Sequence, residues 1–251
     1  MEISKELNLA IQAAKAAGEF LKKRQNIHID TLEGRDIKLS SDKISEKIIM
    51  DYLDESKIPI LSEEYGLKGE KSDTYWIIDP LDGTINYFKG IDEMACVSIA
   101  LWRQNKPQIG VVYRFMKDEL FYGEEGLGAF LNDMPIYPSS IKETSQAVMA
   151  TGFPVKRTYD TKSLMLFIKQ IQNFKKVRMF GAAAIMGTFV ACGRVDAYFE
   201  DEIMIWDVCA AVALTNAAGG YTVLEQLEDS KCICKCFATK ELMEDYYAKG
   251  L

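Results

Sequence analysis

Two aspartates, Asp79 and Asp82, follow an apolar run in the segment WIIDPLDGTINYFKG and are succeeded at once by Gly83 and Thr84. Pro80 lacks a backbone donor and stiffens the exit from a strand, so both carboxylates are predicted to lie on one side of a tight turn. Gly83 allows the backbone to come close to a ligand, and the amides that begin a short helix attract phosphate. Phosphate beside carboxylates requires cations between them, and such oxygen ligands select Mg²⁺ or Mn²⁺ over zinc. The segment predicts a site for metal ions and a phosphate.

Two further acidic positions strengthen this prediction. Glu63 and Glu64 end an apolar run in PILSEEYG, and Asp207 follows apolar residues at a predicted helix start in IMIWDVCAAV. Taken alone, the glutamates are also typical of a solvated turn, and Asp207 is typical of a helix N-cap. Together with the D-x-x-D-G-T segment, they favour one shared acidic site.

The elements that must position these acids differ between the two parts of the chain. Apolar spacing predicts a helix over 3–23 and a second helix over 41–53 that is capped by Ser40 or Ser41. The predicted inner face of the second helix carries Ile44, Ile48 and Tyr52. The runs IPILSE, YWIID, ACVSIALW, QIGVVY, DELFYGEE and GAFLN then indicate short strands in a meander.

Residues 136–251 alternate between strand and helix patterns instead. The segments AVMATGF, KVRMF, VDAYFE and CICKCFA are typical of strands, and the segments between them are typical of helices. We therefore expect an N-terminal α+β half over 1–135 with an antiparallel sheet and the main metal motif. A C-terminal α/β half over 136–251 supplies Glu200 and Asp207, and the site lies in a cleft between the halves.

Composition excludes several classes of protein. The formal charge of −7 argues against a nucleic-acid partner, which requires a basic face. No apolar run is long enough to span a membrane, and the charged N-terminal segment does not resemble a signal peptide. The six cysteines lie mostly in apolar surroundings, as in reduced cytoplasmic proteins. A cytoplasmic protein is therefore expected.

The segment CICKC places Cys232, Cys234 and Cys236 on one face of a strand. A zinc site is the alternative, but it requires a C-x₂-C pair and further ligands, and the only histidine, His28, is distant in sequence. His28 lies in NIHID, which alternates as a strand does, and is expected to be structural or exposed. With one histidine, the chain has little material for a Ser-His or Cys-His mechanism.

The motifs WIIDPLDGTINYF and WDVCAAVALTNAAGG, with the acidic pair in SEEYG, resemble those of the inositol monophosphatases. These are magnesium-dependent, lithium-sensitive phosphatases related to fructose-1,6-bisphosphatases and 3'-phosphoadenosine nucleotidases. The resemblance covers nearly the whole chain, including DIKLSSDKISEKI and GRVDAYFEDEIMIWD. It implies an α+β fold of the layered αβαβα sandwich type, and commonly a homodimer.

The resemblance also implies metal ligands. Glu63, Asp79 and the Leu81 carbonyl hold a first Mg²⁺, while Asp79, Asp82 and Asp207 hold a second. Glu63 reaches a third, weaker ion. Such paired metals stabilise both the attacking and the leaving oxygens of an in-line displacement.

Further roles follow from the same resemblance. Asp42, in the segment SSD, pairs with Thr84 to orient the attacking water, although an acid there is also favoured by the helix dipole. Substrate contacts are implied for Asp82, Gly83, Thr84, Gly181, Ala182, Ala183, Glu200 and Asp207. Two positions depart from the family pattern: Ala182 lacks the usual hydroxyl, and Asp92 stands where proline is usual, in a run one residue longer.

These features favour a phosphomonoesterase for a small phosphorylated polyol, with inositol monophosphate first and metal-activated water as the nucleophile. The same chemistry on a 3'(2'),5'-bisphosphate nucleotide, fructose-1,6-bisphosphate or histidinol phosphate is the alternative, and Leu81 in DPLDGT occurs in nucleotidase relatives. A non-catalytic scaffold on the same fold is disfavoured, because the implied metal carboxylates, Asp42 and Thr84 are all present.

Overall fold

The computed structural model of the chain describes residues 3–25, 27–33, 36–70, 72–154 and 157–250. The helices are α1 (Lys5–Lys22), α2 (Ser40–Leu53), α3 (Thr84–Lys89), α4 (Thr161–Ile171), α5 (Ala183–Ala191), α6 (Ile205–Ala217) and α7 (Lys240–Ala248). The strands are β1 (Ile29–Glu33), β2 (Asp36–Leu39), β3 (Ile60–Ser62), β4 (Gly66–Lys68), β5 (Thr74–Asp82), β6 (Cys96–Arg103), β7 (Lys106–Arg114), β8 (Glu119–Glu124), β9 (Gly128–Leu131), β10 (Met134–Pro135), β11 (Val148–Thr151), β12 (Lys176–Arg178), β13 (Ala197–Met204), β14 (Tyr221–Gln226) and β15 (Lys231–Phe237).

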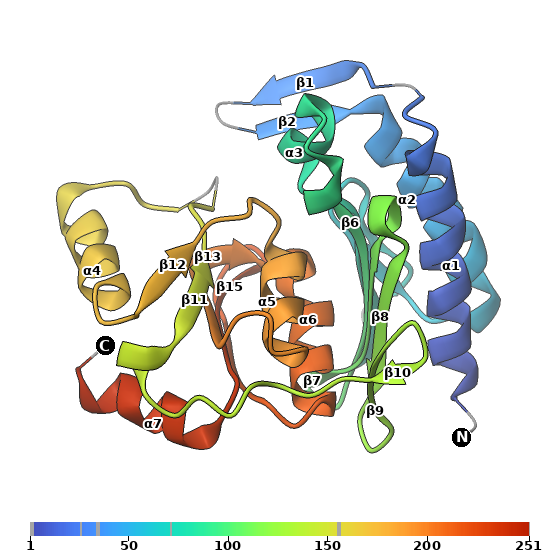
Figure 1. Cartoon of the computed structure of the whole chain (residues 1–251). Coiled ribbons are helices and arrows are strands. Elements are labelled where there is room, and N and C mark those ends of the chain that lie inside the picture. Colours follow the sequence, from blue (N-terminus) through green and yellow to red (C-terminus); the bar gives the residue numbers. More distant parts are fainter. Residues whose placement is uncertain (1–2, 26, 34–35, 71, 155–156, 251) are drawn as a thin grey trace.

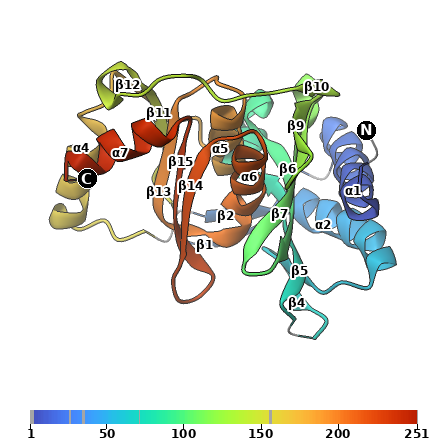
Figure 2. The ribbon, with the colours of Figure 1, turned by 90° about the horizontal axis from the view of Figure 1, so that it is seen from below.

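These elements form stacked layers. Helices α1 and α2 cover one face of an 8-stranded sheet, and α5 and α6 lie between its other face and a 5-stranded sheet (Figures 1 and 2). Helices α4 and α7 lie beyond the 5-stranded sheet (Figure 1). The expected α+β fold of the layered αβαβα type is confirmed.

The 8-stranded sheet has the order β10-β9-β8-β7-β6-β5-β3-β4, in which β3 runs parallel to β5 and the other neighbours are antiparallel. The expected meander is therefore confirmed over β5 to β10. Both faces of this sheet are buried, because Trp76 and Ile78 pack with α1 and α2 whereas Ile77 packs with α5 and α6. This explains why the central strands β5, β6 and β7 are buried over most of their length rather than alternating.

Helix α1 follows the predicted stripe. Leu7, Ala10, Ala14, Ala17 and Leu21 are fully buried. Ser4 caps the helix, because its hydroxyl oxygen accepts the Leu7 amide at 3.1 Å. The helix therefore begins two residues later than the predicted start.

The predictions for α2 are wrong in two respects. Its N-cap is Leu39 rather than Ser40 or Ser41, and the cap amide is satisfied by the side chain of Asp42 at 2.8 Å. Its buried face runs through Ser41, Asp42, Ser45, Glu46, Ile49, Met50 and Leu53. The predicted inner face, with Ile44, Ile48 and Tyr52, lies closer to the solvent than expected, since Tyr52 is 40% exposed. The reason is that the first two turns direct polar side chains inward, toward loops of the sheet.

Strand β5 also differs from prediction, because it does not end in a tight turn after Asp79. The strand continues to Asp82, with a register shift in which Asp79 pairs with Ser98 and Asp82 pairs with Cys96. In a regular strand, residues three apart point to opposite faces. The irregularity at Pro80 instead allows both carboxyl groups to line one cavity.

The 5-stranded sheet has the order β12-β11-β13-β15-β14, with a parallel part (β12-β11-β13) and an antiparallel part. Cys232, Cys234 and Cys236 are fully buried on one face of β15, which confirms the strand prediction. The strand-like alternation of NIHID overlaps the start of β1, whereas the sequence pattern does not indicate β2, β4, β10, β14 or α7. Strand β14 is largely half-buried or exposed and thus lacks a clear apolar alternation.

None of the helices in the described part of the chain has the length and apolarity needed to cross a bilayer. The 8-stranded sheet ends at Pro135 and the 5-stranded sheet lies between Val148 and Phe237. A division into domains at 135/136 stays a prediction.

Candidate functional site

A cavity of about 350 Å³ lies where the two parts of the chain meet. The predicted residues that line it are Glu63, Asp79, Leu81, Asp82, Gly83, Thr84, Gly181, Ala182, Ala183, Glu200 and Asp207. Lining residues that the sequence reasoning missed include Lys38, Gly152, Phe153, Met186, Glu202 and Trp206. Three of these had a signal, because Lys38, Glu202 and Trp206 lie inside the segments that carry the family resemblance.

Asp82 joins the two parts of the chain at this cavity. Its carboxyl oxygens accept the amides of Ala183 at 3.1 Å and Ala184 at 2.8 Å, in the first turn of α5. Ala182 is the N-cap of this helix and has no side chain that caps, so Asp82 replaces a local cap. The Cys96 thiol also donates to Asp82 at 3.6 Å. The position of α5 is therefore fixed from β5.

Asp79 and Leu81 form a compact corner at the β5 irregularity. The Leu81 amide donates to Asp79 Oδ1 at 2.9 Å, and the Leu81 carbonyl accepts the Thr84 hydroxyl at 2.9 Å. Asp79 is 2% exposed, and Leu81 is buried as well. The carbonyl and the carboxyl group that the resemblance assigns to one cation thus belong to one short, hydrogen-bonded segment.

Gly83 is required by its surroundings as well as by its backbone. Its φ is +83°, in the left-handed region, and it precedes α3 as the N-cap. A Cβ placed there would lie 2.5 Å from the Met94 carbonyl oxygen and 3.2 Å from Ala182 Cβ. Only glycine fits this position without movement of the backbone.

Asn86, within the first motif, connects the same regions. Its side-chain amide donates to the Met94 carbonyl at 2.8 Å and to the Phe180 carbonyl at 2.7 Å. Phe180 directly precedes Gly181, which lines the cavity. Asn86 therefore holds α3 next to the Gly181–Ala183 segment.

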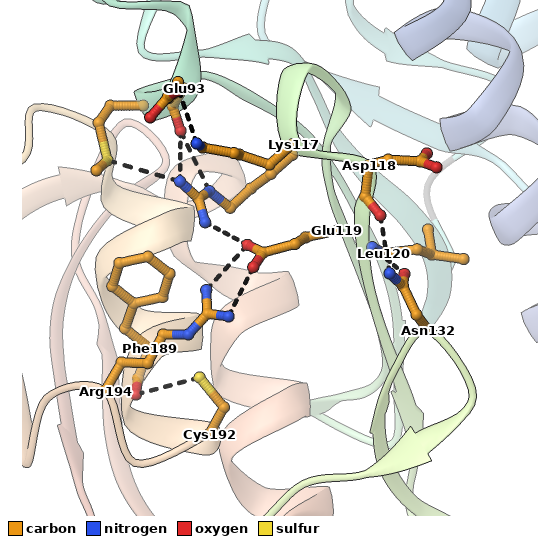
Figure 3. Close-up of polar contacts among 11 residues, drawn as sticks. Glu93, Lys117, Asp118, Glu119, Leu120, Asn132, Phe189, Cys192 and Arg194 are labelled. Atoms are coloured by element: carbon orange, nitrogen blue, oxygen red, sulfur yellow. Dashed lines mark hydrogen bonds and ion pairs between the residues drawn. The ribbon is translucent and has the colours of Figure 1, made fainter.

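An ion cluster holds the segment that contains Glu93 (Figure 3). Arg114 donates to the Glu93 carbonyl at 3.2 and 2.6 Å and forms an ion pair with Glu119. Arg194 reaches both oxygens of Glu119, at 2.9 and 2.6 Å (Figure 3). Since Arg194 follows α5, this cluster is a second connection between the 8-stranded sheet and that helix.

The predicted acidic pair separates into two roles. Glu63 lines the cavity. The Glu64 carboxylate instead forms an ion pair with Lys38 at 3.0 Å. A solvated turn is thus not the environment of Glu64, whose side chain is 6% exposed.

Asp42 and Thr84 are not joined by a hydrogen bond. Asp42 Oδ2 accepts the Leu39 amide, and its other oxygen is buried without a hydrogen-bond partner among the described residues. The Thr84 hydroxyl donates to Leu81. Burial above all, with Glu63 and Glu64 nearby, raises the pKa of Asp42 to about 8. Asp42 is not among the residues that line the cavity.

Glu200 is buried at the cavity wall, 3% exposed, and burial raises its pKa to about 8. It faces Gly152, where a Cβ would lie 2.6 Å from Glu200 Oε1.

Asp92, which stands where the family pattern has proline, does not line the cavity. It is buried and forms an ion pair with Arg24.

The carboxyl groups that line the cavity repel one another when they are charged. Burial, followed by the charges of Glu63, Asp82 and Asp207, raises the pKa of Asp79 well above its usual value. Burial and then Glu63, Asp82 and Glu200 raise the pKa of Asp207 in the same way. Asp207 lies in the first turn of α6 and is not its N-cap, which is Met204.

The donor set suits a hard divalent cation, because carboxylates and a backbone carbonyl are the ligands that Mg²⁺ prefers. No three His, Cys, Asp or Glu side chains among the described residues stand close enough together to form a ready metal cage. Their oxygens are instead directed at neighbouring amides, as at Asp79 and Asp82. The residues therefore fit a cation in the chemistry of their donor atoms.

The chain matches the inositol monophosphatase family over residues 2–242. It is 36% identical over 222 residues to the Nus factor SuhB of Xylella fastidiosa, which covers 86% of this chain and 80% of that relative. A solved structure of the extragenic suppressor protein suhB from Bartonella henselae is 32% identical, with a TM-score of 0.86 and coverage of 98% of both chains.

An inositol monophosphatase structure from Anabaena (Nostoc) is 34% identical, with a TM-score of 0.83 and coverage of 97% of this chain and 93% of that chain. The matches agree in the fold and extend over most of each relative. On this basis the chain belongs to the inositol monophosphatase family.

Proposed function

We propose that this chain is a Mg²⁺-dependent phosphomonoesterase that hydrolyses a small phosphorylated polyol, with inositol monophosphate as the favoured substrate. The observation that carries the proposal is the meeting of Glu63, Asp79, Asp82 and Asp207 at one cavity, from the turn after β3, from β5 and from α6. Buried carboxyl groups that raise one another's pKa are costly unless a cation neutralises them. A cation site next to Gly83 therefore best explains why these buried carboxyl groups lie together.

Glu63, Asp79, the Leu81 carbonyl, Asp82 and Asp207 would hold two or three Mg²⁺ ions, with Mn²⁺ as a substitute. When bound, the ions would polarise the phosphate and lower the pKa of a water molecule. The protein's own part is orientation. The unpartnered oxygen of Asp42 would accept a hydrogen bond from a water molecule and so orient it, and the Thr84 hydroxyl fixes the Leu81 carbonyl.

The polyol would lie between Gly181–Ala183 and Glu200. Glu200 is placed to accept a substrate hydroxyl, whereas Ala182 has none to offer. The same chemistry on a bisphosphate nucleotide, fructose-1,6-bisphosphate or histidinol phosphate is the alternative. Phe153, which is 45% exposed and lines the cavity, is a surface on which a base would stack.

Nus factor SuhB, the name of the relatives, favours a second candidate, a non-catalytic role as a Nus factor. The net charge of −7 argues against direct binding of nucleic acid in such a role.

We also propose that the protein is a homodimer. Light scattering tests this, because a mass near that of a single chain, 28.3 kDa, would contradict it.

The proposed function is tested by phosphate release from inositol monophosphate, 3'-phosphoadenosine 5'-phosphate, fructose-1,6-bisphosphate and histidinol phosphate. Each reaction is run with Mg²⁺ and with excess chelator. We expect turnover of inositol monophosphate with Mg²⁺ and none with chelator, because an acidic cavity cannot hold a phosphate unaided. No release from any substrate would leave the Nus factor candidate in place.

Glu200→Gln is expected to separate substrate recognition from metal chemistry. It should lower kcat/KM for inositol monophosphate by roughly 10–100-fold, the scale of one hydrogen bond to a charged group. Hydrolysis of an aryl phosphate, which has no hydroxyl at that position, should be nearly unchanged. Asp207→Asn is the comparison and should impair both substrates alike. An equal loss of both activities in Glu200→Gln would place Glu200 among the catalytic residues instead.

A further inference from the structure

Glu46 is a buried acidic residue of α2 that has no role as a metal ligand or substrate contact in the proposed function. It is 6% exposed and does not line the cavity. Its Oε1 accepts two successive backbone amides, from Glu64 at 3.2 Å and from Tyr65 at 3.1 Å. A buried carboxyl group on a helix face needs such partners, and here they come from another element.

The amides that Glu46 binds belong to the turn that carries Glu63. This turn connects β3 to β4, and within it the Ser62 hydroxyl also accepts the Tyr65 amide, at 3.3 Å. The bond within the turn fixes its shape, whereas the bonds to Glu46 fix its position relative to α2. Glu63, the residue before the first bound amide, lines the cavity. The position of Glu63 therefore depends on Glu46.

Ser45, the neighbour of Glu46 in α2, binds the segment that contains Asp79 in a similar way. The Ser45 hydroxyl donates to the Pro80 carbonyl at 2.8 Å, and both groups are buried. Pro80 follows Asp79 at the irregularity of β5. One turn of α2 thus holds both the Glu63 turn and the Asp79 segment.

We propose that Glu46 is a positioning residue that sets the distance and direction between Glu63 and Asp79. This inference rests on the proposed function only in assuming that the two carboxylates share a Mg²⁺ site. Groups that orient metal ligands from behind typically change metal affinity by about 10–100-fold when they are removed. Glu46 would contribute on this scale without touching the ion or the substrate.

The test compares Glu46→Leu, Glu46→Gln and Ile49→Val with wild type. Leucine keeps the bulk of the side chain but accepts no hydrogen bond, whereas glutamine keeps one acceptor oxygen. Ile49 is fully buried on the same face of α2 and bonds to neither segment, so its variant controls for a general loss of stability. The measurements are Mg²⁺ binding by calorimetry, amide exchange at Glu64 and Tyr65, and phosphate release against Mg²⁺ concentration.

We expect Glu46→Leu to weaken Mg²⁺ binding by about 10-fold or more and to speed exchange of both amides. Glu46→Gln should restore most of both properties, and Ile49→Val should change neither. Glu46→Leu with the wild-type Mg²⁺ affinity would overturn the positioning role. A wild-type protein that binds Mg²⁺ but releases no phosphate would overturn the proposed function alone, because binding and exchange report on Glu46 without turnover.

Discussion

Asp79→Asn is expected to abolish phosphate release, by about 10³-fold or more, while the protein remains folded. The resemblance assigns Asp79 to both cations, and loss of a group that stabilises transition-state charge through a metal costs several kcal/mol. The substitution is nearly isosteric, and the side-chain oxygen of the asparagine can still accept the Leu81 amide that Asp79 accepts at 2.9 Å. The loss should therefore come from charge rather than from a rearranged segment.

Stability should change in the opposite direction to activity. Burial and three neighbouring acids raise the pKa of Asp79, so the folded protein without metal loses stability as the pH rises above the usual pKa of an aspartate. Asp79→Asn removes this cost, and the metal-free variant should melt at or above the wild-type temperature at neutral pH. Mg²⁺ at 100 times its Kd should stabilise wild type by about 2.7 kcal/mol and the variant far less. Equal Mg²⁺ stabilisation of both proteins would contradict the bridging role.

Gly83→Ala is expected to have the second largest effect, about 10²-fold in kcat/KM, with a loss of stability. A left-handed conformation costs an alanine roughly 1–2 kcal/mol, and the added Cβ would lie 2.5 Å from the Met94 carbonyl oxygen. Relief of this contact requires movement of the Met94 segment or of α3, whose first residues, Thr84 and Ile85, line the cavity. A displacement of this kind would misplace the phosphate of the proposed substrate relative to Asp79 and Asp82.

Gly90 offers a matched control at the other end of α3. Its φ is +77°, but a Cβ there meets nothing within 4 Å. Gly90→Ala therefore carries the cost of a left-handed alanine but makes no contact like that of an alanine at position 83 with the Met94 carbonyl. It should lower the melting temperature while kcat/KM stays near that of wild type. If both variants lost activity equally, strain in α3 rather than the contact at Met94 would explain the result.

The ordered spacing of acids in the sequence was sufficient to predict that Glu63, Asp79, Asp82 and Asp207 meet at one cavity. Asp79, Asp82 and Gly83 lie within one short segment, so their chemistry is a local property that the sequence displays directly. The same holds for α1 and β15, whose burial follows the period of a helix and of a strand. In each case the neighbours that matter are a few residues away.

The prediction for α2 failed because apolar periodicity assumes that polar residues face water. Ser45 and Glu46 are polar and buried, since each bonds to a backbone group of another element that is distant in sequence. Nothing in the segment SSDKISEK shows that such partners exist. The missed elements β14 and α7 are also largely surface elements, whose patterns carry little apolar contrast.

The sequence by itself thus determined the fold class, most of the helices and strands, and the acidic residues Glu63, Asp79, Asp82, Glu200 and Asp207 that line the cavity. Only the tertiary structure decided which face of α2 is buried, that β5 continues through an irregularity to Asp82, and that Asp82 caps α5 from 101 residues away. It also separated Glu63 at the cavity from Glu64 in its ion pair with Lys38. The physical reason is that hydrogen bonds and ion pairs of buried polar groups are made with partners distant in the chain, whereas the sequence pattern records only whether each residue prefers water.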